Sequence, residues 1–161
     1  MKTPRREGST ALHALLLTLC LSLALCSCGF LNRPRSLFGG KLPVQVVIPP
    51  NVNEDSPVAV DLVLIQKKKL IDKILEKSAR EWFGGREQFR RDFPGGYSVA
   101  SWEWIPGQEV PLLEVPVKRG TKTGIVFVDL FTPGQHRVRI DPRKPLRLEI
   151  SAASFTAEEA P

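Results

Sequence analysis

The chain has 161 residues, 42% hydrophobic and 25% charged. This is enough for one domain with its own core, and the composition argues against general disorder. The formal net charge is +6, but Lys2, Arg5 and Arg6 lie at the extreme N-terminus, and the chain from Cys28 onward carries 20 basic and 16 acidic side chains, a balance of +4. So small an excess favours a normally solvated surface over a nucleic-acid footprint, and no nucleic-acid partner is expected.

The cysteines are confined to one part of the chain. Cys20, Cys26 and Cys28 all lie within the first 28 residues. The rest of the sequence can therefore hold no disulfide framework, no thiolate zinc site and no cysteine nucleophile. Its stability has to come from core packing.

Residues 1–27 are predicted to be a signal peptide. A short positive stretch precedes an apolar run over Ala11–Cys26, and this run is shorter than the roughly 20 residues of a membrane-spanning helix. The segment Leu25-Cys26-Ser27-Cys28 resembles the bacterial lipobox, in which the last thiol accepts diacylglycerol. We therefore expect cleavage before Cys28 and lipidation of its thiol, palmitate included. Gly29 in place of aspartate favours sorting to the outer membrane. The alternative is an ordinary secretory signal that ends near a cysteine.

Residues 28–42 are predicted to form the lipidated N-terminus and a tether, because they are rich in turn formers and lack periodicity. A β pattern begins at Pro43. The first two expected strands are Val44–Ile48 and Val58–Ile65, joined by a polar loop at Asn51–Pro57. The second strand is apolar on both faces apart from Asp61, which predicts a central position in a sheet.

A helical insertion is expected near residues 68–93. Apolar side chains at spacings of three and four define one helical face: Ile71, Ile74, Leu75, Ser78 and Trp82. Gly84-Gly85 is predicted to end this helix, and a further turn or two is expected over Arg86–Phe93. Lys67-Lys68-Lys69 at the start of the insertion would oppose the helix dipole, and the pattern offers no reason for them.

The remainder of the chain returns to strands. They are expected at Tyr97–Ile105, Leu113–Val117, Ile125–Phe131, Val138–Ile140 and Leu146–Ile150. Pro111 and Pro116 place the second of these at a sheet edge, and residues 152–161 are expected to form a flexible C-terminal tail. Seven short strands and one helical insertion predict a mainly β protein, a two-sheet β-sandwich over residues 43–151.

The sequence gives little sign of catalysis. His136 is the single histidine after Cys28, and no Gly-x-Ser-x-Gly turn supplies a serine nucleophile. Asn51, Asn53 and Asp55 alternate like calcium ligands, but the later positions of such a loop are not filled. We expect no catalytic residue, no metal and no cofactor. Trp102 and Trp104 share one face of a strand, where they either pack in the core or form a ligand surface.

The order of these features resembles the TssJ family (also called VasD or SciN), the outer-membrane lipoproteins of type VI secretion systems. The segments that carry the resemblance are Asn51-Val52-Asn53, Ser56–Val60, Leu64-Ile65-Gln66, Pro106-Gly107-Gln108 and Gly124–Val128. The insertion over Lys67–Gly96 departs from the usual family pattern. The chain is therefore similar to a divergent member.

The resemblance implies a transthyretin-like sandwich without catalytic activity, on the periplasmic face of the outer membrane. It implies a partner, the periplasmic domain of the inner-membrane protein TssM (IcmF-related). It also implies that the loop between the first two strands contributes to that contact, which here means Asn51, Val52, Asn53, Glu54, Asp55, Ser56 and Pro57. The alternatives are a binding module of another envelope assembly and a small-ligand binder that uses Trp102 and Trp104.

Overall fold

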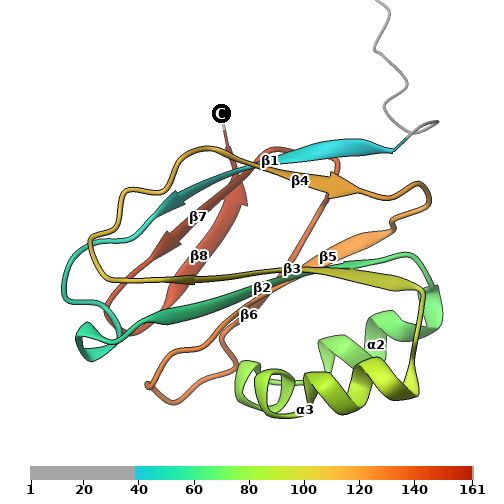
Figure 1. Cartoon of the computed structure of the whole chain (residues 1–161), viewed down its shortest axis with the longest axis horizontal. Helices are drawn as coiled ribbons and strands as arrows, with labels where there is room; N and C mark the ends of the chain where they lie inside the picture. Colours follow the sequence, from blue (N-terminus) through green and yellow to red (C-terminus); the bar gives the residue numbers. More distant parts are fainter. Residues whose placement is uncertain (1–38, 161) are drawn as a thin grey trace, which may run out of the picture. The chain divides into compact units, whose positions relative to one another are not determined.

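The computed structural model describes residues 39–160, which form two four-stranded β-sheets with helices against one of them (Figure 1). The strands are β1 (Gly40–Val47), β2 (Val58–Ile65), β3 (Tyr97–Trp104), β4 (Leu113–Val117), β5 (Thr123–Val128), β6 (Arg137–Ile140), β7 (Leu146–Ile150) and β8 (Phe155–Glu159). The helical segments are η2 (Asn53–Asp55), η3 (Lys68–Leu70), α2 (Ile71–Leu75) and α3 (Ala79–Asp92). The mainly β sandwich expected from the sequence is confirmed.

The two sheets have the strand orders β4-β1-β7-β8 and β3-β2-β5-β6. Neighbouring strands are antiparallel except β1 and β7, which run parallel. β2 is central, as its apolar pattern predicts: Val60 pairs with Trp102 of β3 on one side and with Val128 of β5 on the other. β4 is an edge strand, as predicted from Pro111, which precedes it, and Pro116, which lies within it.

Strand direction gives the sandwich two distinct ends. Gly40 of β1 pairs with Val117 at the end of β4, and Ile65 at the end of β2 pairs with Thr123 at the start of β5. The connections at residues 39, 66–69, 118–122 and 141–145 therefore lie at one end, which we call the Gly39 end. The connections at 48–57, 105–112, 129–136 and 151–154 lie at the other, which we call the η2 end.

Apolar side chains pack between the two sheets. β1 contributes Leu42, Val44 and Val46, and each of the other strands adds residues of the same face. Trp104 belongs to this core and is 4% exposed, while Trp102 is partly buried against it, with its ring stacked 5.5 Å from that of Trp104. The two tryptophans therefore pack with the core, and the ligand-surface reading loses its basis.

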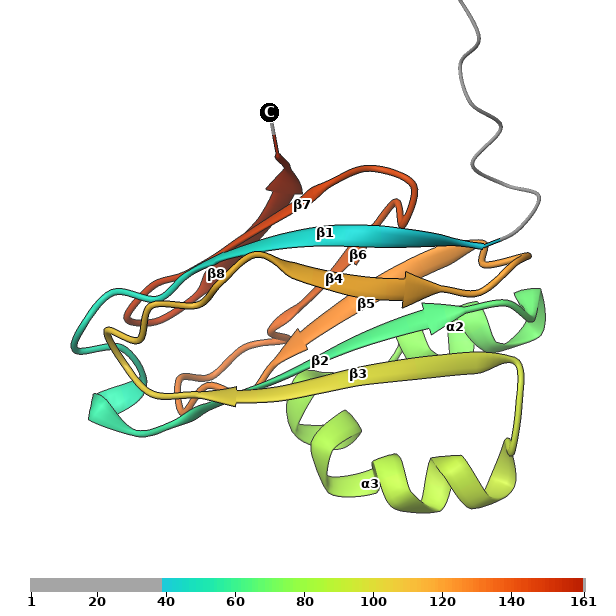
Figure 2. The ribbon, with the colours of Figure 1, turned by 45° about the horizontal axis from the view of Figure 1, so that its top comes forward.

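The outer face of the β3-β2-β5-β6 sheet is covered by α2 and α3 (Figure 2). The indole of Trp82 stacks on Phe127 with ring centroids 5.1 Å apart. Beneath it Asp61, 1% exposed, accepts hydrogen bonds from Trp82 Nε1 at 2.8 Å and from an Arg86 guanidinium nitrogen at 2.9 and 3.1 Å. A buried carboxylate is stable only with such partners, so Asp61 fixes where α3 sits on β2.

The helical insertion is divided differently from the sequence prediction. α3 runs from Ala79 to Asp92 through Gly84-Gly85, so the predicted stop at these glycines is wrong. The break lies at Ser78, whose backbone N–H and hydroxyl group bond the Glu81 carboxylate at 2.7 and 2.8 Å in a capping box that starts a new helix. The backbone hydrogen bond from Ser78 is the main cause that lowers the pKa of Glu81. Each of the two glycines lowers the stability of the helix by about 1 kcal/mol relative to alanine, and the burial of Trp82 and Phe89 offsets this loss.

Both predicted boundaries of the sandwich need correction. The tether was expected to reach residue 42, but β1 begins at Gly40 and Leu42 is buried. Residues 152–161 were expected to form a flexible tail, yet β8 pairs with β7 from Ile150–Phe155 onward. The hairpin is closed by the Ser151 N–H, which donates to the carbonyl oxygen of Ser154 at 2.8 Å. The predicted signal peptide and Cys28 lie outside the described residues. No helix within residues 39–160 is long and apolar enough to cross a membrane.

Candidate functional site

The loop between β1 and β2 has an unusual backbone. Asn51, Asn53, Glu54 and Asp55 all adopt left-handed conformations, with φ of 63°, 50°, 55° and 59°. Asn and Asp tolerate this region, whereas a residue such as Glu54 adopts it at a cost of about 1–2 kcal/mol. Such strain persists only where the surrounding structure holds it, and it is frequent at functional sites.

Two buried side chains hold the loop in this shape. Val52 packs into the core between the sheets, and Asn53 is 4% exposed. The Asn53 Nδ2 group donates to the Pro57 carbonyl oxygen at 3.1 Å, and its Oδ1 accepts from the Phe131 N–H at 2.8 Å. The loop is therefore tied both to itself and to the β5–β6 connection. Its geometry is set before any partner binds, which lowers the entropy cost of binding.

The remaining loop residues present polar groups to solvent. Asn51, Glu54, Asp55 and Pro57 are exposed, and Ser56 is half-buried. No salt bridge within residues 39–160 engages Glu54 or Asp55. Of the seven residues expected to bind a partner, Val52 and Asn53 thus lie inside the domain, where they position the others.

Two apolar side chains that sequence reasoning missed lie beside this loop, and a third, Leu112, lies further along the 105–112 connection and is 66% exposed. Phe131 is 58% exposed, and its N–H is the group bound by Asn53. Ile105, 60% exposed, directly follows Trp104, whose strand partner is Val58, so it lies beside Pro57. Large exposed apolar residues beside polar ones are typical of protein interfaces. We call Asn51, Glu54, Asp55, Pro57, Ile105 and Phe131 the η2 surface.

The exposure of Phe131 corrects a sequence prediction. The apolar run over Ile125–Phe131 was expected to be a core strand throughout, but β5 ends at Val128. The chain turns where the Asp129 N–H donates to the Ala59 carbonyl oxygen at 2.8 Å. Leu130 then points into the core and Phe131 outward.

His136 is bonded within its own turn. Its ring Nε2 lies 2.7 Å from the Thr132 carbonyl oxygen and 3.3 Å from the Thr132 hydroxyl, within its own turn. Its backbone φ is 41°, another left-handed residue of the η2 end. Across residues 39–160, no three His, Cys, Asp or Glu side chains gather as metal ligands would. Within this part of the chain the η2 surface is the strongest candidate for function.

Solved structures share the architecture of this chain, although the comparisons by sequence found no match. No protein-family model matches the chain, and no curated protein matches it in sequence. The T6SS lipoprotein TssJ1 from Pseudomonas aeruginosa superposes with a TM-score of 0.60 at 13% identity, over 76% of this chain and 98% of that one. The domain has the TssJ fold.

Two further solved structures are similar in fold. Serratia marcescens Lip, described as a membrane-bound component of the type VI secretion system, gives a TM-score of 0.58 at 9% identity, covering 76% of this chain and 99% of that chain. A chain in the structure described as the T6SS protein TssM C-terminal domain from EAEC gives 0.51 at 18% identity, with 76% and 98% covered. The resemblance to TssJ noted in the sequence is confirmed at the level of the fold.

Proposed function

We propose that the chain is a divergent TssJ-type lipoprotein of a type VI secretion membrane complex. In this proposal Cys28 carries the lipid, the domain stays on the periplasmic face of the outer membrane, and the η2 surface docks a TssM-type inner-membrane protein. The role is structural, without catalysis. The main support is the TssJ fold combined with a preorganised, solvent-facing loop between β1 and β2.

The chemistry of the η2 surface suits a protein partner. Ile105 and Phe131 offer apolar groups of the kind that fill pockets at the centre of interfaces. Glu54 and Asp55 add negative charge, which steers a basic partner surface and fixes its orientation. Because Asn53 and Val52 already hold the loop, little ordering is left to oppose binding.

The position of the N-terminus suits a link between a membrane and a partner. Cys28 precedes Gly39 by eleven residues, a reach of at most about 40 Å. β1 then carries the chain from the Gly39 end towards the η2 end, about 26 Å for eight residues. The segment that leads to Cys28 therefore joins the sandwich at the end opposite the η2 surface.

The docking proposal is tested by immobilising the mature chain and passing over it the periplasmic part of TssM from the same organism. We expect retention with a Kd in or below the micromolar range. Circular dichroism is the control that the immobilised domain is folded. If a folded domain does not retain TssM, then TssM is not the partner, and the alternative of another envelope assembly is left.

Lipidation is tested separately by growth with an alkyne-tagged palmitate. The wild-type chain should take up the label and partition with the outer-membrane fraction. Cys28→Ser should lose both, whereas the matched change Cys26→Ser should keep them. A labelled Cys28→Ser chain would show that another residue carries the lipid.

A further inference from the structure

Basic side chains gather at the Gly39 end of the sandwich. Ten exposed cations lie on the connections and strand ends there: Lys41, Lys67, Lys68, Lys69, Lys118, Arg119, Lys122, Arg139, Arg143 and Lys144. We call this set the basic end. It includes the three consecutive lysines for which the sequence pattern gave no reason. It also includes Lys118, Arg119 and Lys122, which flank Gly120, the left-handed turn residue between β4 and β5.

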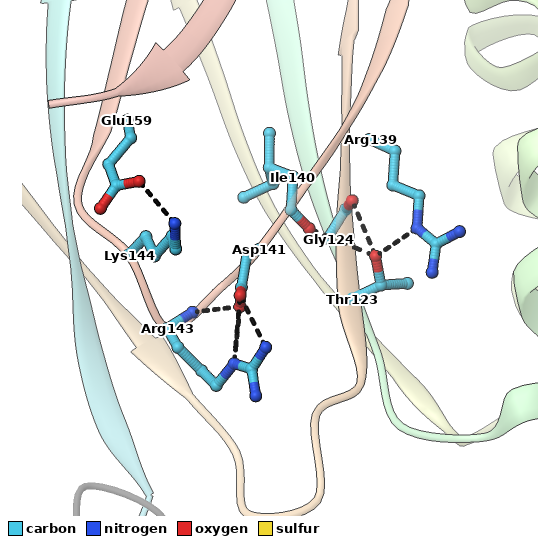
Figure 3. A network of polar contacts seen from close by, with 8 residues as sticks. All are labelled: Thr123, Gly124, Arg139, Ile140, Asp141, Arg143, Lys144 and Glu159. Carbon is cyan, nitrogen blue, oxygen red and sulfur yellow. Dashed lines mark hydrogen bonds and ion pairs between the residues drawn. The ribbon is translucent and has the colours of Figure 1, made fainter.

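Backbone and side-chain contacts bring these segments together. The Lys122 N–H donates to the Ile65 carbonyl oxygen at 2.8 Å, and the Gln66 amide donates to the Thr121 hydroxyl at 3.1 Å, which ties the β4–β5 turn to the start of the lysine run. A hollow of about 340 Å³ is lined by residues 39–41, 117–121 and 142–143. The Arg139 Nε–H donates to Thr123 at 3.0 Å on the adjoining strands (Figure 3).

Few carboxylates balance this charge. Three of the ten cations form ion pairs. Lys41 pairs with Glu114, and Figure 3 shows the other two pairs, Arg143 with Asp141 and Lys144 with Glu159. Among residues 39–160 the other seven form no salt bridge. Hydrogen bonds from Arg143 lower the pKa of Asp141 to about 2, so this carboxylate stays charged at neutral pH. Glu158 lines the same hollow as Arg139 and Lys144 and is a fourth carboxylate of this end. A positive excess is still left, on the end where the described chain begins.

We propose that the basic end lies against anionic phospholipid headgroups of the membrane that holds the lipid anchor, and so turns the η2 surface away from that membrane. This inference rests on the proposed lipid attachment for its location. The eleven residues that separate Cys28 from Gly39 limit the distance of the domain from the lipid but not its orientation. Each Lys or Arg close to an anionic leaflet raises the affinity about fivefold, but only within a Debye length of about 8 Å. Cations clustered on one end therefore select one orientation.

The proposal accounts for the contrast between the two ends. The η2 surface carries Glu54 and Asp55, which anionic headgroups repel, while the Gly39 end carries ten exposed cations. An anionic leaflet thus attracts one end and rejects the other. The membrane is favoured over an acidic protein as the occupant because the chain leads from Gly39 towards Cys28, where the lipid is proposed to sit.

The test uses the mature chain with Cys28→Ser, so that no lipid contributes to binding. The protein is mixed with vesicles of phosphatidylethanolamine and phosphatidylglycerol, and in parallel with vesicles of phosphatidylcholine alone. We expect cosedimentation with the anionic vesicles only, weakening as salt is raised. Binding to neither kind of vesicle, or equally to both, would overturn the proposal, as would binding to peptidoglycan or an acidic protein in place of the anionic vesicles.

A pair of matched variants locates the surface. Lys118→Gln/Lys122→Gln removes two cations of the basic end, neither of which forms a salt bridge within the described residues, and should weaken vesicle binding about 25-fold. Arg80→Gln/Arg137→Gln removes the same charge near the η2 end and should change it less than twofold. Equal losses in the two variants would point to net charge alone and overturn the proposal. Retention of TssM, measured on the same proteins, separates failure of this inference from failure of the docking proposal.

Discussion

The two ends of this sandwich are both made of strand connections, but different forces shape them. At the η2 end a buried asparagine and a buried valine hold a left-handed turn, and the exposed groups sit on a fixed frame. At the Gly39 end the distinctive side chains are exposed cations, a few of them in surface ion pairs. Buried hydrogen bonds are costly to break singly, whereas surface charges contribute little each and act in sum. Mutations at the two ends should therefore differ in kind.

The largest expected effect comes from Asn53→Ala. It leaves the Phe131 N–H and the Pro57 carbonyl oxygen without their partner, at about 1–3 kcal/mol, and places alanine at a φ of 50°, at about 1 kcal/mol more. We expect a loss of about 2–4 kcal/mol in the free energy of unfolding, measured with urea. Retention of TssM should fall at least tenfold, because Glu54 and Asp55 lose their fixed positions.

A change of similar size away from both ends supplies the control. Trp82→Phe removes the indole N–H bonded to Asp61 but keeps the Arg86 ion pair and an aromatic ring on Phe127. It should lower stability by about 2–3 kcal/mol while TssM retention stays within twofold. If both variants lost binding to the same degree, reduced stability rather than loop geometry would explain the loss.

Glu54→Lys/Asp55→Lys should weaken docking, with a smaller effect on the stability of the fold than Asn53→Ala. Both side chains are exposed, and only Asp55→Lys adds backbone strain, at a φ of 59°, so stability should fall by no more than about 1–2 kcal/mol. Reversing two charges opposite a basic partner should weaken TssM binding tenfold or more, mainly through the association rate at low salt. Glu76→Lys/Glu158→Lys makes the same charge change elsewhere and should leave binding unchanged. An unaltered association rate in the loop variant would exclude these carboxylates from the interface.

Much of the fold could be predicted because its signals are local. Alternating apolar residues in Val44–Ile48 and Leu146–Ile150 mark the face that packs between the sheets, and the unbroken run in Val58–Ile65 marks the central strand. Asp61 was visible as the one charge in that strand. Its partner was not, because Arg86 reaches it only through the direction in which α3 crosses the sheet.

The errors have a common physical origin, since each was decided by contacts distant in sequence. Gly84-Gly85 stays helical because Trp82 and Phe89 on the same helix are buried against the sheet. Phe155–Glu159 becomes a strand because the edge of β7 is free to pair. The resemblance was enough to place the docking loop at Asn51–Pro57, but it could not predict which residues of the loop are buried and which are exposed. That division depends on a bond from Phe131 to Asn53, 78 positions away.

The smallest expected effect belongs to the ion pair of Asp141 and Arg143 at the Gly39 end. Arg143 lowers the pKa of Asp141 in the folded state from 3.8 to about 2. Because the folded pKa lies below the unfolded one, the pair stabilises the fold above about pH 4, and this contribution is lost as the pH falls from about 4 through 2. Arg143→Gln should return the carboxyl pKa, followed by carbon NMR, towards 3.8 and change neutral-pH stability by less than about 1 kcal/mol, since Arg143 is exposed. An Asp141 that titrates near 4 with Arg143 present would mean that its charge is unpaired in solution. The acidic side chains of this end would then be free to oppose an anionic surface, and the contrast between the ends would be weaker than the structure implies.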